Sequence, residues 1–435
     1  WRVRVLEHLP GQVLAEVRPK TNGLLKELGR QIADLEHRLG TITLEPPDRS
    51  GFIWALAEAG TVMEQGMSFH ADPARQALVE ACLADFVDAQ PTASSLPRQL
   101  VHGDLNDHNI LVGGDPQSNR RVTGILVFGD SHVAPPVFDL AIAAAYLCLD
   151  AADPLAAATD VVRGYHARRP LTEPELDILF PLIRARLGAS VTVSASRRQG
   201  SSELDEYLLI SEAPAWRALA SMGEIHPRLA RGFFRDACGL PACPRRAPLV
   251  DWIRAQTPAP VMDIPVGPET VVLDHSVGSP DLTGRDTDDT PDFARRVFAR
   301  MEQEGARVGL GRYLEPRGFY LTDAFAGRPS EPPERRTIHL GIDVYDRAGA
   351  PVHAPLEATV RRVRDNAGRL DYGPTVTLEH DTPHGPFWTL YGHLERASVA
   401  DLEEGTQIAA GTAFARVGPY PENGDWPPHL HLQVM

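Results

Sequence analysis

The spacing of apolar residues changes between the two ends of this chain. In residues 1–240 they recur every three or four positions, as from Leu24 to Leu39, which predicts amphipathic helices. In residues 335–435 the apolar runs are short and are separated by Gly and Asp turns, which predicts strands. A chain of 435 residues is long enough for two or three separate cores. We therefore predict a multidomain protein with a mostly helical first domain and a mostly β last domain.

Local signals predict where several elements begin and end. Asn22 is the predicted N-cap of one helix, and Thr172 with Glu175 predicts a capping box at the start of another. Short β-like runs at 110–112 and 122–128, with glycines between them, predict a hairpin. In the last domain we predict strands at 359–363, 375–379 and 387–391.

Prolines are concentrated between the two domains. Residues 241–334 show little periodicity apart from a helix that is predicted to begin after Thr290 and Pro291. We therefore predict a domain over 1–240, a proline-rich linker region with a short helix over 241–334, and a domain over 335–435 that begins after the proline pair of 331–333.

Charge, hydropathy and cysteine content exclude several classes of protein. The 43 basic and 58 acidic residues give a formal net charge of −15, which argues against nucleic acid or an anionic membrane as a partner. The longest uncharged apolar run, 140–149, is far shorter than the roughly 20 residues of a membrane span. Four cysteines without CxxC spacing fit a reducing compartment, so we expect a cytoplasmic protein. Because the chain begins at Trp1, we expect a piece of a longer protein, and a secretion signal upstream stays an alternative.

A polar loop follows an apolar strand at 102–109, where Asp104 precedes Asn109 by five residues. In phosphoryl transfer, an Asp in such a loop takes the proton of the acceptor hydroxyl, and the Asn holds Mg²⁺ on the nucleotide phosphates. Together with the downstream Phe138-Asp139-Leu140-Ala141, the loop resembles the aminoglycoside phosphotransferase and choline kinase superfamily, in particular its hydroxylysine-kinase-like branch. The resemblance covers residues 1–240. It implies a protein-kinase-like C-lobe that contains a β-hairpin, a small-molecule acceptor, Asp104 as base and Asn109 as a ligand of Mg-ATP.

Two departures from this family pattern predict a degenerate or truncated kinase. Val127 stands where the family has the Mg²⁺-binding Asp of Asp-Phe-Gly, and a valine has no oxygen ligand to offer. Too few residues precede Asp104 for a complete nucleotide-binding N-lobe, and neither Lys20 nor Lys26 lies in a predicted strand. We therefore expect no turnover of Mg-ATP by this chain. A working small-molecule kinase with an accessory β domain is the alternative.

Histidines are concentrated in the last domain, which holds seven of the sixteen. If His339–Asp343 and His429–His431 are strands, alternation turns the His and Asp side chains of each to one face and the apolar residues between them into the core. Two imidazoles, one carboxylate and a fourth position left for water are the ligand set of a hydrolytic zinc site. Such a zinc activates water and polarises a carbonyl, so these motifs predict amide hydrolysis. His393 lies between the motifs and is a candidate to orient water or stabilise the oxyanion.

Together with Tyr391-Gly392-His393-Leu394, these motifs resemble the LytM and lysostaphin family of zinc endopeptidases, which has the duplicated hybrid motif β-sheet fold. The resemblance covers residues 335–435. It implies three zinc ligands, His339, Asp343 and His431. It also implies two catalytic histidines, His393 and His429, and a peptide or peptidoglycan-type substrate.

The two halves together resemble the first parts of bacterial fusions that join a kinase-like module, a LytM-like module and a class III aminotransferase. We therefore expect a further C-terminal domain beyond Met435 in the full-length protein. Three functions remain: a zinc metallopeptidase carried on a degenerate kinase-like domain, a small-molecule kinase, and a non-enzymatic binding part of an aminotransferase fusion. We favour the first, because its five site residues are all present.

Overall fold

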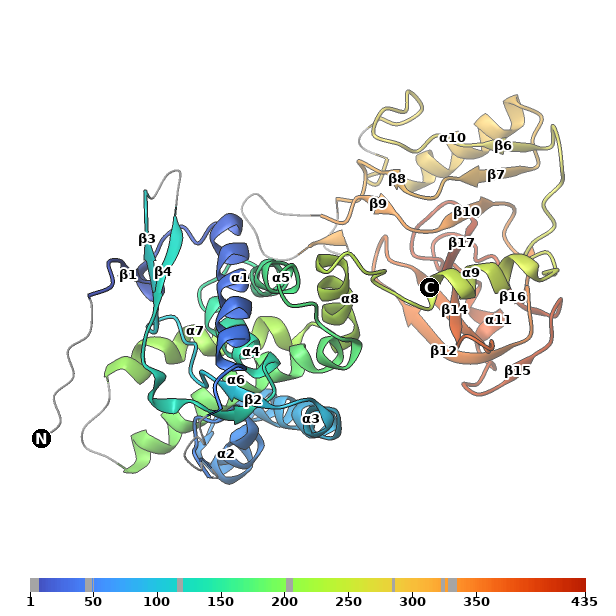
Figure 1. The fold of residues 1–435 in the computed structure, drawn as a ribbon. Helices are drawn as coiled ribbons and strands as arrows, with labels where there is room; N and C mark the ends of the chain where they lie inside the picture. Colours follow the sequence, from blue (N-terminus) through green and yellow to red (C-terminus); the bar gives the residue numbers. More distant parts are fainter. Residues whose placement is uncertain are drawn as a thin grey trace, which may run out of the picture. The chain divides into compact units, whose positions relative to one another are not determined.

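The structure is a computed structural model. It describes residues 8–43, 49, 51–115, 120–200, 206–283, 286–321, 325–327 and 335–435. The chain divides into two compact units, Trp1–Pro244 and Arg245–Met435 (Figure 1). Residues 331–333, after which the sequence predicts the last domain to begin, lie outside the described residues.

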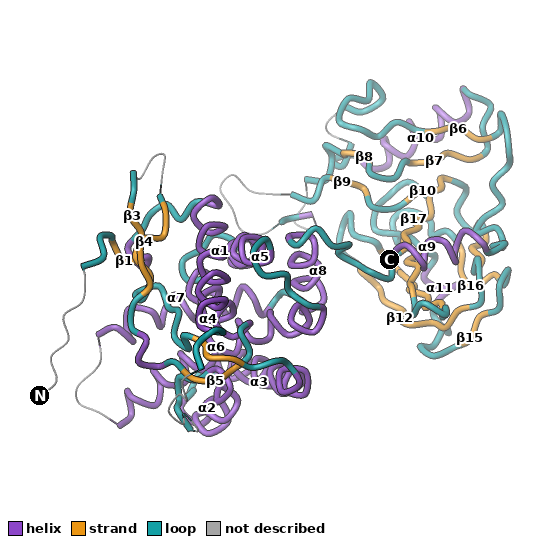
Figure 2. The backbone as a smooth tube through the Cα atoms, in the orientation of Figure 1, coloured by secondary structure: helices purple, strands orange, loops and turns teal. Residues whose placement is uncertain are grey.

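The first unit is mostly helical, as predicted (Figure 2). Its described helices are α1 (Asn22–Leu39), α2 (Ala59–Gly66), α3 (Pro73–Ser95), α4 (Val137–Leu147), α5 (Pro154–His166), α6 (Glu173–Gly200), α7 (Glu206–Gly223) and α8 (Pro227–Ala237). Its described strands are β1 (Gln12–Val13), β2 (Gln99–Val101), β3 (Ile110–Gly113), β4 (Arg121–Ile125) and β5 (His132–Ala134). They form one sheet in the order β1-β3-β4 and a second sheet of β2 and β5.

Two of the local predictions in this unit are confirmed and one is wrong by one position. β3 and β4 pair antiparallel as the predicted hairpin. In the capping box of α6, Thr172 N donates to Glu175 Oε2 at 2.8 Å and Glu175 N donates to Thr172 Oγ1 at 3.4 Å. The N-cap of α1 is Thr21, whose hydroxyl accepts from the backbone N–H of Leu24 at 3.3 Å, and Asn22 is the first helical residue. Thr and Asn are both favourable N-cap residues, so residue type alone could not decide whether Thr21 or Asn22 caps the helix.

Helix α6 lies at the centre of the first unit. It is the one helix among the described residues that is long and apolar enough to cross a membrane by length and composition. Its apolar window is 94% buried inside the protein, and a core helix passes the same test. Its buried leucines and isoleucines and Val191 belong to the main hydrophobic core of this unit.

The second unit is built on an eight-stranded sheet in the order β15-β12-β13-β14-β17-β10-β7-β6. These strands are β6 (Thr270–Val272), β7 (Val308–Gly311), β10 (Ile342–Tyr345), β12 (Ala358–Asn366), β13 (Gly373–His380), β14 (Phe387–Gly392), β15 (Gln407–Ile408) and β17 (His429–Val434). Two strand pairs stand beside the sheet, β8 (Glu315–Pro316) with β9 (Ile338–His339) and β11 (Pro351–His353) with β16 (Ala413–Arg416). The described helices are α9 (Arg246–Ala255), α10 (Thr290–Gln303) and α11 (Arg396–Val399). Strands β12, β13 and β14 confirm the three predicted strands.

The prediction of a linker over 241–334 is wrong for most of that segment. Strand β7 pairs with β10, with Gly311 opposite Asp343, and β6 extends the same sheet by pairing parallel to β7. The predicted helix is present as α10, although it begins at Thr290 rather than after Pro291, and its Phe293 joins a core cluster with Trp426 from the end of the chain. Periodicity missed this part because its strands are short and because its core cluster is completed by residues distant in the chain, Tyr345, Leu370 and Trp426.

Candidate functional site

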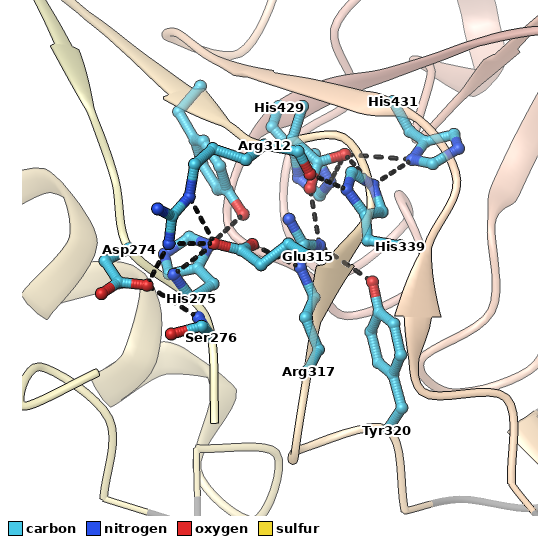
Figure 3. A network of polar contacts seen from close by, with 12 residues as sticks. Asp274, His275, Ser276, Arg312, Glu315, Arg317, Tyr320, His339, His429 and His431 are labelled. Atoms are coloured by element: carbon cyan, nitrogen blue, oxygen red, sulfur yellow. Dashed lines mark hydrogen bonds and ion pairs between the residues drawn. The ribbon is translucent and has the colours of Figure 1, made fainter. Parts of the chain in front are cut away.

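Three buried side chains from β9, β10 and β17 meet in one cluster, of which His339 and His431 are labelled in Figure 3. Asp343 of β10 pairs in register with His431 of β17, and His339 ends β9. Nε2 of His339 lies 3.0 Å from Nδ1 of His431 and 3.1 Å from Oδ1 of Asp343, and Nδ1 of His431 lies 3.0 Å from the same oxygen. Ligand atoms bound tetrahedrally at 2.0–2.1 Å lie about 3.3 Å apart, so this triangle is close to that of a metal site. Nδ1 of His339 faces the backbone oxygen of Arg312 at 2.8 Å, which leaves the Nε2 lone pair for a metal.

The strand predicted from His339 to Asp343 is interrupted, because β9 ends at His339 and β10 begins at Ile342. Alternation still brings the two polar side chains together. The intervening Leu340 and Ile342 are 52% and 46% exposed, however, so the prediction that they pack into the core is wrong. His339 and Asp343 are the buried residues here, because parts of the segment read as a linker line the polar face. In β17, Leu430 is buried as predicted.

Gly341 lies between the two motif residues, where a side chain has no room. A Cβ at this position would lie 2.6 Å from Nε2 of His431 and 2.8 Å from the backbone oxygen of Leu432. The imidazole of His431 therefore lies directly against the backbone of residue 341. The glycine is visible in the sequence motif, but its role follows only from the position of β17.

His429 faces this cluster from β17, and His393 faces it from the position directly after β14. Each uses Nδ1 to donate to a backbone oxygen, His429 to Pro427 at 2.6 Å and His393 to Asn423 at 2.8 Å. Their ring centroids are 4.3 Å apart. Burial, reinforced by neighbouring imidazoles, lowers the pKa of His393 well below its usual value, and burial lowers the pKa of His429 to about 4. Both are therefore neutral near pH 7, with a free lone pair on Nε2.

The carboxylate of Asp343 is paired with a buried arginine that sequence reasoning missed. Nη1 of Arg317 lies 2.7 Å from Oδ2 of Asp343. Burial by itself would raise the pKa of Asp343, but Arg317 and His429 hold it well below its usual value. Asp343 is thus ionised at neutral pH and turns Oδ1 toward the histidines. Arg317 gave no sequence signal because it lies in the region read as a linker.

A cavity of about 370 Å³ opens beside these residues and lies within the usual size range of small-ligand pockets. All five residues singled out in the last domain line it: His339, Asp343, His393, His429 and His431. Aromatic side chains form much of the remaining wall, including Tyr320, Tyr372 and Trp426. The arrangement joins a three-atom metal-binding triangle, two neutral imidazoles and an apolar wall in one pocket.

The kinase-like residues form a separate site in the first unit. Asn109 Nδ2 donates to Asp104 Oδ2 at 3.0 Å, and Asn106 Nδ2 donates to the same oxygen at 2.8 Å. The other oxygen, Oδ1, lies 2.8 Å from Nη2 of the buried Arg186 of α6. The structure thus brings Asp104 and Asn109 together, and side chains of the protein contact both carboxylate oxygens of Asp104.

Val127 occupies the position of the expected Mg²⁺ ligand. Its φ is 61°, in the left-handed region that a β-branched residue rarely adopts, and its side chain is 56% exposed. Lys20 precedes α1 and Lys26 lies within it, so neither lysine is in a strand, as predicted. The side chain at 127 therefore offers no oxygen to a cation.

Comparisons with known proteins match the two units separately. Residues 1–174 match the family described as "Phosphotransferase enzyme family", and residues 337–435 match "Peptidase family M23". Hydroxylysine kinase of Xenopus laevis is 31% identical over 233 residues, which are 51% of this chain and 62% of that protein. The chain thus spans about three fifths of the length of this relative.

Two solved structures also resemble parts of the chain. A zinc-containing peptidase from Vibrio cholerae is 27% identical, covers 23% of this chain and 28% of its own, and has a TM-score of 0.19. A microcompartment-associated aminopropanol kinase is 18% identical, covers 51% of this chain and 65% of its own, and has a TM-score of 0.33. The two family matches divide the chain into a kinase-like and a peptidase-like region. Its N-terminal part is an aminoglycoside phosphotransferase and choline kinase-like domain with hydroxylysine kinase relatives, and its C-terminal part is a LytM-like peptidase family M23 domain.

Proposed function

We propose that the second unit is a zinc-dependent metalloendopeptidase and that the first unit is a degenerate phosphotransferase domain. One observation carries the peptidase proposal: His339, Asp343 and His431 present three donor atoms 3.0–3.1 Å apart on the wall of a cavity that His393 and His429 also line. Two imidazoles and a carboxylate without a thiolate are typical of a hydrolytic zinc site rather than a structural one.

In this proposal Nε2 of His339, Oδ1 of Asp343 and Nδ1 of His431 hold the metal. The zinc supplies a Lewis acid that activates water and polarises the scissile carbonyl. His393 and His429 are neutral bases that face the same space, so one would accept the proton of the attacking water through Nε2. As an imidazolium it would stabilise the developing oxyanion and pass the same proton to the leaving amine, while the other histidine would orient the water. The carbonyls of Asn423 and Pro427 fix the rings of these two histidines, so that Nε2 of each points into the cavity.

The proposed substrate is a peptide, and within that class a peptidoglycan-type peptide. The match to peptidase family M23 supports this choice, and the aromatic wall of the cavity offers contact area for an extended chain. The cytoplasm remains the proposed location, because all four cysteines are free thiols.

Metal analysis of single variants tests these roles. His431→Ala should remove zinc from the purified chain, because it deletes a ligand. His393→Ala and His429→Ala should keep zinc and lose hydrolysis of a glycine-rich or peptidoglycan-type peptide. The exposed His384 gives a matched control, since His384→Ala should keep both properties. Equal zinc loss in the His431, His393 and His429 variants, with zinc kept by His384→Ala, would contradict the proposed division of roles.

A second candidate function is phosphorylation of a small amine or hydroxyl compound, and the likeness to hydroxylysine kinases over 233 residues favours it. The contacts of Asp104 and the valine at 127 weigh against it. Magnesium-dependent ATP turnover that responds to hydroxylysine, and that Asp104→Asn abolishes, would establish this activity. We expect neither binding of Mg-ATP nor phosphate transfer.

A further inference from the structure

The segment ahead of the matched peptidase region supplies part of the wall around the metal triangle. Strand β8 pairs with β9, which places Glu315 opposite His339, and β7 places Gly311 opposite Asp343. The backbone oxygen of Arg312 faces Nδ1 of His339 at 2.8 Å. Two of the three proposed ligands are therefore held by residues that precede position 337, where the family match begins.

Arg317 connects this segment to Asp343, the carboxylate of the triangle. Figure 3 shows Arg317 beside Glu315 and Tyr320. Its Nε donates to Glu315 Oε2 at 3.0 Å, and its Nη1 lies 2.8 Å from the hydroxyl oxygen of Tyr320 and 2.7 Å from Oδ2 of Asp343. The side chains of Glu315, Arg317 and Asp343 are 1%, 4% and 1% exposed. A planar guanidinium can face two carboxylates at once from different edges, which a lysine ammonium on a flexible stem does not reproduce.

The sheet leaves space for this guanidinium. At Gly311 a Cβ would lie 2.9 Å from Nη2 of Arg317 and 3.2 Å from Oδ2 of Asp343. A side chain at this position would therefore press on the arginine and the carboxylate together. Gly311, Arg317 and Glu315 together enclose the Oδ2 atom of Asp343, the oxygen that does not contact the histidines.

This contact decides which oxygen of Asp343 is available. Oδ2 is occupied by Arg317, whereas Oδ1 lies within 3.1 Å of both His339 Nε2 and His431 Nδ1. A carboxylate without such a partner could turn about its Cβ–Cγ bond or bind a metal through both oxygens. Partners that orient ligands typically change metal affinity about 10–100-fold when they are removed.

We propose that Arg317, held by Glu315, is a positioning residue that restricts Asp343 to binding the metal through Oδ1. This inference rests on the proposed zinc site and extends it into a segment that the family match does not cover. Arg317 acts through Asp343 and does not itself contact the metal.

The test uses the full chain and measures metal binding rather than hydrolysis. Zinc affinity is determined by competition with a chromophoric chelator for the wild type, Arg317→Met and Arg317→Lys. Arg317→Met should bind zinc at least about ten-fold more weakly. Arg317→Lys keeps the positive charge but loses the planar set of N–H donors of the guanidinium. Its zinc binding should therefore stay at least about three-fold weaker than that of the wild type. At saturating Co²⁺, the visible spectrum of both variants should differ from that of the wild type, because the carboxylate binds differently.

Arg307→Met is the matched control. Arg307 comes from the same segment and pairs with Asp263 at 3.0 Å and with Asp346 at 3.5 Å, neither of which belongs to the triangle. Its loss should change neither zinc affinity nor the cobalt spectrum. If circular dichroism shows that Arg317→Met does not fold, Glu315→Gln replaces it as the test of the positioning role. Glu315→Gln keeps an acceptor oxygen for the backbone N–H of His275, but it removes the charge that pairs with Arg317. Glu315→Gln should weaken zinc binding about three-fold or more.

The outcomes separate this inference from the proposed function. A wild type that binds no zinc would overturn the metal site itself. A wild type that binds zinc, together with an Arg317→Met variant of equal or higher affinity and an unchanged cobalt spectrum, would overturn the positioning role alone. If Arg317→Met cannot be folded, unchanged binding by Glu315→Gln would do the same.

Discussion

Replacing Asp343 by Asn should destabilise the metal-free second unit, because the change leaves Arg317 as a buried charge without its closest partner. The substitution preserves shape and removes only the negative charge. Breaking a buried ion pair by altering one partner costs about 3–5 kcal/mol. Both side chains here are nearly inaccessible, so screening by solvent does not reduce this cost. Glu315 remains 3.0 Å from Nε of Arg317, so we expect the lower end, about 3 kcal/mol.

For a unit of about 190 residues, 1 kcal/mol shifts the melting temperature by about 2–4 °C, so the second-unit transition should fall by about 6–12 °C. The assay is differential scanning calorimetry of the full chain after removal of metal by a chelator. The transition of the first unit serves as an internal reference. Asp365→Asn is the matched control, because Asp365 and its partner Arg396 are 37% and 49% exposed. The loss of unfolding free energy in this variant should stay within about 1 kcal/mol. A second-unit transition within about 3 °C of the wild type in Asp343→Asn would refute the dependence of Arg317 on Asp343.

Three further predictions concern other parts of the chain. Val127→Asp should raise the stability of the first unit by about 1 kcal/mol, because Asp tolerates a positive φ better than Val, and should still give no ATP turnover in an enzyme-coupled assay. Limited proteolysis should cut first within residues 241–248, all of which are exposed, and a first cut near residue 335 would contradict this division. Burial lowers the pKa of His275 to about 3, below its value in the unfolded chain. The stability that the neutral His275 contributes is therefore present above about pH 6.5. It is lost as the pH falls toward 3, by up to about 1.4 kcal/mol per pH unit. Denaturation at pH 7 and pH 5 should therefore show a smaller acid-induced loss for His275→Asn than for the wild type.

The sequence alone predicted features whose physical cause is local. The helical period of the first part, the Thr172–Glu175 capping box and the hairpin after Asn109 each depend on residues close in the chain, and the structure confirms them. The His and Asp motifs of the last domain were also visible, because their chemistry requires particular residue types at particular spacings. The resemblances to a phosphotransferase and to an M23 peptidase were stated from these motifs and are confirmed by the comparisons.

Only the tertiary structure decided what depends on contacts between distant segments. It showed that much of 241–334 belongs to the second unit, because β7 is recognisable as a strand only through its pairing with β10. It exposed Leu340 and buried His339, since the preceding segment packs on the polar side of that strand. It also placed Arg317 against Asp343, two residues that the chain separates by 26 positions and that no local pattern connects. Burial and charge pairing are properties of the assembled core, and for this reason a linker reading of the same residues could not reveal them.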